Sequence, residues 1–359
     1  MTIDEISGEA HAVATTHGED TPAEGGRHGS LLELDHVSLA LPTENGFVGI
    51  LDDVTFRIRP GEMVGLAGES GSGKTMTALA IMQLLPAGRR LDGHILFDGR
   101  DLASLSKSEI RAVRGKEIAM IFQEPMSSLH PSWTIGEQIA EAVRAHERVS
   151  RKAAMARAVD MLRLVDIPDP AGRARQYAFQ FSGGMQQRVM IAMALVNHPR
   201  LLIADEPTTA LDVTVQAQII ELIRGLSAEF GMAVLFVTHD LGVLAGLAER
   251  MIVMYGGQVA EIDSTESMFA RPSHPYTAAL IRTAPHPDLK GQRLATIAGA
   301  PPHPGRLPSG CRFNPRCEFA IDVCHTTPVP IVSTGTRQAV RCHRHAELDL
   351  SMTTVGVTL

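Results

Sequence analysis

Residues 68–75 constrain the fold of this chain more than any other segment. They read Gly-Glu-Ser-Gly-Ser-Gly-Lys-Thr and lie between an apolar run at 63–67 and a helical run at 76–85. Strand, glycine-rich turn and helix in this order form a phosphate-binding loop, in which backbone N–H groups and the positive end of the helix face phosphate oxygens. Lys74 can reach the β- and γ-phosphates, and the Thr75 hydroxyl can ligate Mg²⁺. The segment predicts an α/β protein that binds a nucleoside triphosphate through Gly68, Glu69, Ser70, Gly71, Ser72, Gly73, Lys74 and Thr75.

Apolar runs of strand length alternate with helical patterns from residue 31 onward, which is typical of a sheet covered by helices. We predict strands at 31–39, 54–58, 63–67, 94–97, 118–122, 201–204, 233–237 and 251–255. Between 134 and 197 the pattern is helical, because apolar residues recur three and four positions apart. These residues are Ile135, Ile139, Val143, Met161, Leu164 and Val165. We therefore expect a helical part that interrupts the sheet.

The length of 359 residues suits a main domain plus an appendage, because single hydrophobic cores stop growing near roughly 250–300 residues. We expect a disordered tail over 1–30, a main domain over 31–265 with its helical part at about 124–197, and a proline-rich extension over 266–359. The net charge of −7, without a dense basic stripe, argues against a nucleic-acid partner. No apolar run approaches the roughly 18 residues that a membrane span needs.

Two carboxylates follow the apolar run at 201–204, where the carboxyl ends of parallel strands meet the ligand crevice. We assign Asp205 to the Mg²⁺ shell and Glu206 to the water that attacks the phosphate, because phosphoryl transfer depends mainly on positioning and charge stabilisation. A solvated turn that caps a helix is the alternative interpretation of this pair. The presence of the phosphate loop in the same chain favours the catalytic interpretation of the acidic pair.

Residues 181–188 read Phe-Ser-Gly-Gly-Met-Gln-Gln-Arg and precede this acidic strand. Together with the phosphate loop and the acidic pair, they resemble the signature of ABC ATPases. The resemblance implies a P-loop NTPase core of RecA-like fold with a helical subdomain, in which the signature loop of one chain closes on the ATP of a second chain. N–H groups at the start of the following helix could meet the γ-phosphate. The implied contacts to the partner's ATP are Ser182, Gly183, Gly184, Met185 and Gln186.

Further positions match motifs of the same family. Gln123 resembles the glutamine that senses Mg²⁺ and the γ-phosphate, and His239 resembles the switch histidine that contacts the γ-phosphate. Asp212 resembles the loop along the dimer interface, and it is equally an ordinary helix N-cap. The family usually stacks an aromatic residue on adenine. Phe47 is the candidate here, and Leu41 would be an aliphatic alternative.

Three stretches of the last third, at 274–277, 297–302 and 310–317, resemble the C-terminal region of ATPase subunits of peptide importers. The resemblance implies ATP hydrolysis coupled to import of peptides or related small solutes at the cytoplasmic face of the cell membrane. Implied partners are a second, identical or homologous ATPase subunit, two transmembrane permease subunits and, indirectly, an extracytoplasmic solute-binding protein. The rival hypothesis is a non-transport ABC ATPase that acts in nucleic-acid repair or regulation. The sequence does not name the solute.

The stretch after Gln123 abuts the membrane subunit in this family. Met126, Leu129 and Trp133 are therefore candidate contacts to a permease. Packing inside the helical part is an equally good interpretation of these apolar residues.

All 4 cysteines lie near the C-terminus, at Cys311, Cys317, Cys324 and Cys342. Disulfides are disfavoured in a reducing cytosol, so thiolate ligation of a metal is the leading interpretation. The absence of a Cys-x-x-Cys pair fits a [4Fe-4S] cluster better than a zinc ribbon, and the family resemblance favours the same cluster. Zinc, with a histidine replacing a thiolate, and four thiols buried as small apolar groups remain the alternatives. A cluster here could be a structural staple for proline-rich loops or a redox sensor.

Overall fold

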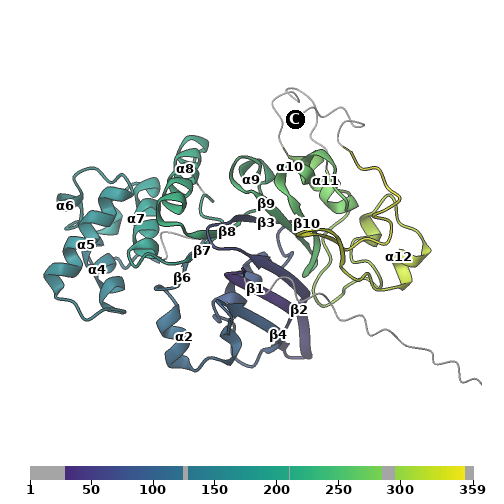
Figure 1. Cartoon of the computed structure of the whole chain (residues 1–359), viewed down its shortest axis with the longest axis horizontal. Coiled ribbons are helices and arrows are strands. Elements are labelled where there is room, and N and C mark those ends of the chain that lie inside the picture. The colour runs from purple at the N-terminus through teal and green to yellow at the C-terminus, as the bar shows by residue number, and fades with distance from the viewer. Residues whose placement is uncertain (1–28, 124–127, 210, 285–295, 352–359) are drawn as a thin grey trace, which may run out of the picture.

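The computed structural model describes residues 29–123, 128–209, 211–284 and 296–351. Its centre is an eight-stranded sheet with the order β11-β12-β10-β9-β3-β8-β7-β6 (Figure 1). The strands from β9 to β6 are parallel to their neighbours, so their carboxyl ends meet at one edge. They are β3 (Met63–Ala67), β6 (Ile118–Ile121), β7 (Leu201–Asp205), β8 (Ala233–Val237) and β9 (Arg250–Tyr255).

The other end of this sheet is antiparallel. Strand β10 (Gln258–Ser264) pairs with β9 and also with β12 (Gln338–Val340), which in turn pairs with β11 (Val332–Gly335). Two strands of the C-terminal segment thus extend the central sheet. The domain boundary at 265/266 stays a prediction.

A second, antiparallel sheet has the order β2-β1-β4-β5 and lies beside the central sheet (Figure 1). Its strands are β1 (Leu32–Thr43), β2 (Gly46–Ile58), β4 (Arg90–Phe97) and β5 (Arg100–Asp101). Successive side chains of a strand point to opposite faces, so each central strand supplies two apolar clusters. In β8, Val234 and Phe236 pack with the helical side, whereas Leu235 and Val237 pack with the second sheet.

Helices of 4 to 18 residues connect the strands. They are α1 (Lys74–Ile81), α2 (Lys107–Val113), α4 (Ile135–Arg144), α5 (Arg151–Leu164), α6 (Pro170–Arg173), α7 (Gly183–Leu195), α8 (Val213–Phe230), α9 (Leu241–Leu247), α10 (Thr265–Ala270), α11 (Pro275–Thr283) and α12 (Asp322–Thr326). Single 3₁₀ turns form η1 (Leu102–Ser104), η2 (Ala178–Gln180) and η4 (Asn314–Arg316). Within the described ranges, no helix combines the length and apolar character that crossing a membrane requires.

The helical part lies at one end of the long axis, and the C-terminal segment with α12 lies at the other (Figure 1). Ile135, Ile139 and Val143 are fully buried in it, as their spacing predicts. A capping box at Thr134 starts α4. Leu164 differs from the prediction, because its side chain at the end of α5 is 38% exposed.

All eight predicted strands are present, and the described residues hold four further strands that were not predicted. Strand β10 was missed because its buried face carries Glu261 and Asp263, which break the apolar pattern expected of a buried strand. Strands β5, β11 and β12 have only two to four residues, which is too short for an apolar pattern, and all four side chains of β11 are exposed. The predicted tail over 1–30 lies outside the described residues, apart from its last two positions.

Candidate functional site

The phosphate loop joins β3 to α1 and depends on glycine. Gly68 has φ +145°, and a side chain there would clash with the carbonyl oxygen of Met254 in β9. Gly73 has φ +107° and precedes α1, and no side chain caps the helix there. The Oγ atom of Ser72 is buried and, within the described residues, has no hydrogen-bond partner. An unpartnered hydroxyl beside an uncapped helix start suits a ligand that accepts hydrogen bonds.

Lys74 closes the loop on itself. Its Nζ donates to the carbonyl oxygens of Gly68 at 2.6 Å and Glu69 at 3.1 Å. Burial lowers the pKa of this amine, whereas the nearby carboxylates, first those of Glu206 and Asp205, act to raise it. The amine is therefore held on the loop carbonyl oxygens, within reach of the charge of the acidic pair.

The acidic pair lies at the end of β7, and the pKa values of its two carboxyl groups are shifted in opposite directions. Burial, with the charge of Glu206, raises the pKa of Asp205 despite a 3.3 Å hydrogen bond from the Thr75 hydroxyl. Burial also acts to raise the pKa of Glu206, but the hydrogen bond and charge of His239, the hydrogen bond from Thr209 and the charge of Lys74 together outweigh it, so the pKa is lowered. Two neighbouring carboxyl groups whose pKa values are shifted apart are a common feature of catalytic sites.

Glu206 is the centre of a hydrogen-bonded cluster. Gln123 Nε2 donates to its Oε2 atom at 2.9 Å, and the Thr209 hydroxyl donates to the same atom at 3.0 Å. His239 Nδ1 lies 3.0 Å from Oε1. Gln123, Glu206 and His239 follow three neighbouring parallel strands, β6, β7 and β8, which explains how residues far apart in sequence meet. Three side chains thus orient the carboxylate, and its lowered pKa favours the ionised form.

Thr209 was not selected from the sequence. It lies three residues after Glu206, within the Asp-Glu-Pro-Thr-Thr run that follows β7. A hydroxyl three positions beyond a carboxylate in a turn is a recurrent partner for it, and that spacing was the available signal.

The signature residues begin α7. Ser182 is its N-cap and accepts a hydrogen bond from the backbone N–H of Met185 at 3.4 Å. A side chain at Gly184 would lie 2.8 Å from a methyl carbon of Val215 in α8. Glycine therefore lets the start of α7 approach α8 closely.

Gln186 and Asp212 have partners within this chain. The Gln186 side chain is buried and donates to the carbonyl oxygens of Ala178 at 2.9 Å and Phe181 at 3.3 Å. Asp212 accepts a hydrogen bond from the N–H of Val215 at 3.0 Å and is the N-cap of α8, as the sequence allowed. Their contacts to a second chain stay predictions.

Phe47 lies near the turn of the β1–β2 hairpin and is 43% exposed. The guanidinium carbon of Arg90 lies 3.7 Å from the centroid of its ring, which is a cation–π contact. Leu51, farther along β2, is the residue of this strand that lies against the phosphate loop at Gly73. The adenine contact of Phe47 stays a prediction.

Two known families match separate parts of the chain. The ABC transporter family matches residues 51–209, and the oligopeptide/dipeptide transporter C-terminal region matches residues 260–324. The oligopeptide transport ATP-binding protein OppD of Salmonella typhimurium is 45% identical over 298 residues, which are 83% of this chain and 89% of that protein. The chain belongs to the ABC transporter family. A second member, a Brucella melitensis protein named for peptide import and ATP binding, is 45% identical over 331 residues, 89% of this chain and 98% of its own.

Solved ABC structures share the fold. A dimeric ATP-binding cassette in a post-hydrolysis state with ADP and Pi superimposes with a TM-score of 0.59 at 30% identity, covering 65% of this chain and 98% of its own. The cbiO1 protein of Clostridium perfringens, with a TM-score of 0.58 and 24% identity over 67% of this chain and 91% of its own, adds support for the fold alone. The predicted P-loop ABC ATPase fold is confirmed, and this chain is an ATPase of the ABC transporter family.

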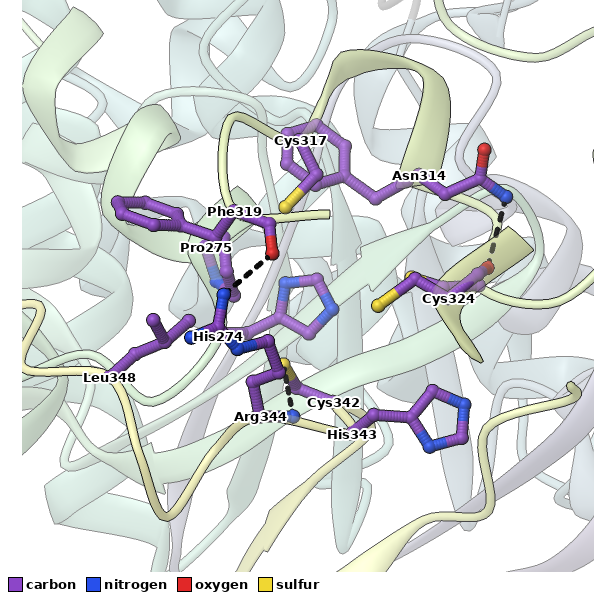
Figure 2. Close-up of a pocket in the computed structure, with 12 residues that line it drawn as sticks. His274, Pro275, Asn314, Cys317, Phe319, Cys324, Cys342, His343, Arg344 and Leu348 are labelled. Carbon is purple, nitrogen blue, oxygen red and sulfur yellow. Dashed lines mark hydrogen bonds between the residues drawn. The ribbon is translucent and has the colours of Figure 1, made fainter. Parts of the chain in front are cut away.

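The four cysteines of this ABC subunit, which all lie between residues 311 and 342, line one pocket (Figure 2). The sulfur atoms of Cys317, Cys324 and Cys342 point toward the same space, and none of the four forms a disulfide. Burial, with the neighbouring thiols, raises the pKa of Cys317 and of Cys342 to about 11. In the parts of the chain that the structure describes, no three His, Cys, Asp or Glu side chains converge closely enough to hold a metal ion. The predicted metal staple is therefore not shown.

Two residues of the C-terminal segment contact the phosphate loop, and sequence reasoning selected neither. The Tyr276 hydroxyl accepts a hydrogen bond from the N–H of Glu69 at 2.8 Å. Arg316 forms an ion pair with the Glu69 carboxylate. Both lie in the stretches that resemble the peptide-importer branch, but nothing in the sequence indicated that these stretches contact the phosphate loop.

Proposed function

We propose that this chain powers the import of peptides or related small solutes through two separate permease subunits at the cytoplasmic face of the cell membrane. The observation that carries the proposal is the Glu206 cluster beside the phosphate loop, in a chain whose residues 260–324 match the oligopeptide/dipeptide transporter region. OppD and the Brucella protein, which are named for this kind of transport, support the same conclusion.

ATP would bind with its phosphates on residues 68–75. Lys74 neutralises phosphate charge, and Glu206 orients and deprotonates the attacking water. Gln123 and His239 hold the Glu206 carboxylate in place through the two hydrogen bonds described above. The Thr75 hydroxyl and the Asp205 carboxylate, which already contact each other, are the oxygen ligands suited to Mg²⁺. When bound, that ion neutralises charge on the phosphate oxygens.

Two subunits would enclose two ATP molecules. The signature residues Ser182, Gly183, Gly184, Met185 and Gln186 and the loop at Asp212 would face the partner's nucleotide. The two helix starts support this arrangement, because α1 has no side-chain cap and α7 begins with two glycines after its Ser182 cap, so both can present backbone N–H groups to a nucleotide. Closure of the pair on ATP and reopening after hydrolysis would drive the permease.

Glu206→Gln tests the catalytic assignment. We expect ATP binding to persist and hydrolysis to fall by about 10²–10⁴-fold, because the amide cannot accept the proton of the attacking water. The readouts are nucleotide affinity and steady-state ATPase rate. Glu221→Gln on the exposed face of α8 is the matched control and should leave both unchanged. Near-normal turnover of the Glu206 variant would remove this residue from the mechanism.

Transport requires a separate test. We expect the chain to co-purify with two membrane subunits and to support ATP-dependent uptake of labelled peptides by vesicles that contain the assembly. ATP-dependent DNA binding at physiological salt, without such co-purification, would favour the nucleic-acid alternative instead.

Trp133 is the proposed contact to a permease. It is 45% exposed and lines a groove of about 410 Å³ with Glu137, Arg144 and Arg151. Leu129 is buried among apolar residues of the helical part, which supports the packing interpretation for this residue. Met126 lies outside the described residues.

The cysteine pocket would hold a [4Fe-4S] cluster, with Zn²⁺ as the alternative. The support for a multi-atom cluster is that all four cysteines line the same pocket. Iron, sulfide and zinc analysis after anaerobic purification distinguishes the two. ATPase rates before and after oxidation then separate a redox sensor from a structural staple. A chain free of both metals would leave four thiols packed as small apolar groups.

A further inference from the structure

Glu69 is the residue through which the C-terminal segment holds the phosphate loop. Its backbone N–H donates to the Tyr276 hydroxyl at 2.8 Å, and its carbonyl oxygen accepts from Ser72 N–H and Lys74 Nζ, each at 3.1 Å. Its carboxylate accepts two hydrogen bonds from Arg316, Nη1 to Oε2 at 2.6 Å and Nη2 to Oε1 at 3.0 Å. Each polar group of this loop residue therefore has a fixed partner.

Arg316 is itself held rigidly. Its side chain is 4% exposed, and its Nε donates to the carbonyl oxygen of Ala298 at 2.9 Å. Its Nη1 also donates to the Tyr255 hydroxyl at 3.2 Å, and its guanidinium carbon lies 5.9 Å from the centroid of the Phe313 ring. A buried guanidinium needs a counter-charge, and Glu69 supplies it in the two-point geometry that arginine favours.

We propose that Arg316 is a positioning residue for ATP binding, which fixes the phosphate loop through Glu69 and links it to the wall of the cysteine pocket. The inference rests on the proposed binding of ATP to residues 68–75. Arg316 ends η4, which lies between Cys311 and Cys317 in sequence, and Asn314 in the same turn donates to the carbonyl oxygen of Cys324 at 3.2 Å. The side chain that holds the loop thus projects from the wall of the pocket.

Loss of Arg316 has an electrostatic consequence besides a structural one. The Glu69 carboxylate, whose side chain is 24% exposed, would stay beside the phosphate site without its counter-charge. A negative charge there repels the phosphates of ATP, and the released carboxylate no longer fixes the loop. Removing the carboxylate as well should therefore restore part of the ATP affinity.

The test measures ATP affinity of the full chain with a fluorescent ATP analogue, and melting temperature in parallel. We expect Arg316→Ala to weaken ATP binding roughly tenfold and Arg316→Lys to weaken it less, because lysine keeps the charge but not the two-point contact. The double variant Arg316→Ala with Glu69→Gln should bind ATP better than Arg316→Ala alone. A merely structural role predicts no such rescue. If Arg316→Ala does not fold, Arg316→Lys and its combination with Glu69→Gln give the same comparison.

Arg341 provides a matched control. It precedes Cys342 as Arg316 precedes Cys317, its side chain is 7% exposed, and it pairs with the carboxylate of Asp53 in β2 instead of the loop. We expect Arg341→Ala to lower the melting temperature and to leave ATP affinity unchanged. The proposal is overturned if Arg316→Ala binds ATP like the unchanged chain. It is also overturned if Arg316→Ala and Arg341→Ala weaken ATP binding equally. Failure of the unchanged chain to bind ATP would instead contradict the proposed function.

Discussion

Glu206 and Cys317 lie in two sites that differ in what holds their side chains in place. Glu206 follows β7, and its partners Gln123 and His239 follow the neighbouring strands β6 and β8. Cys317 lies in an irregular segment, and the thiols that share its pocket come from separate turns and the short helix α12. A regular sheet brings strand ends together by its topology, whereas loops converge only through their particular tertiary contacts. The comparison shows that the sheet positions the side chains around Glu206. The cysteine pocket depends instead on the contacts between its loops and on any group bound inside it.

Gly68→Ala is the strongest test of the claim that the framework fixes the phosphate site. Its φ of +145° and the carbonyl oxygen of Met254 leave no room for a methyl group, so we expect a loss of about 3–5 kcal/mol in free energy of unfolding. ATP binding should be lost with it. Denaturant titration and nucleotide binding measure the two effects. Gly225→Ala in α8 is the control, because no atom lies within 4 Å of the added methyl group. It should raise the free energy of unfolding by about 0.5–1 kcal/mol.

Cys324→Ser tests the opposite claim, that the cysteine pocket depends on its contents. Cys324 is buried, and burying a hydroxyl without a good partner costs about 1–3 kcal/mol. If a metal group fills the pocket, anaerobic chelation of the unchanged chain should lower its melting temperature similarly, and the variant should no longer respond to the chelator. An unchanged chain that is insensitive to chelation would show that the thiols are ordinary packing groups. ATP affinity should change less than in the Gly68 variant.

Glu261 lies in β10, where the central sheet meets the C-terminal segment, and its pH dependence tests how the two are held together. Burial raises its pKa to about 7, although it accepts hydrogen bonds from the N–H groups of Ser273 and His274. A carboxyl group whose pKa is higher in the folded state stabilises below its unfolded pKa, and this contribution is lost as pH rises through about 7. Stability should therefore fall between about pH 4.5 and 7, by at most about 1.4 kcal/mol per pH unit. Glu261→Gln should flatten the melting temperature across this window, and an unchanged slope would contradict the assignment.

Ser182→Ala should have the smallest effect on stability. It removes the N-cap of α7, which costs about 1 kcal/mol. Because the proposed nucleotide contact of Ser182 is to a partner chain, ATP affinity of the isolated chain should stay the same while the ATPase rate of the dimer falls. Binding at low protein concentration and hydrolysis at high concentration separate these readouts. A loss of affinity in the isolated chain would place Ser182 at its own nucleotide.

The sequence by itself determined the parts of this protein that depend on local patterns. The eight predicted strands are present because apolar runs of strand length must be buried, and the phosphate loop is recognisable because only glycine tolerates its backbone. The acidic pair was selected because it directly follows such a run, whereas Gln123 and His239 were selected because their positions match motifs of the ABC family. Strand β10 escaped prediction because Glu261 and Asp263 are buried through hydrogen bonds that only the tertiary structure supplies.

The tertiary structure alone decided which distant residues hold these parts together. Arg316 and Glu69 are 247 positions apart, so nothing in their local sequence indicates that they form an ion pair. The burial of Leu129, the exposure of Leu164 and the contact of Thr209 with Glu206 depend likewise on neighbours from other elements. Local backbone preference and apolar periodicity act over a few residues, whereas charge pairing and packing act between whatever residues the fold brings within contact distance.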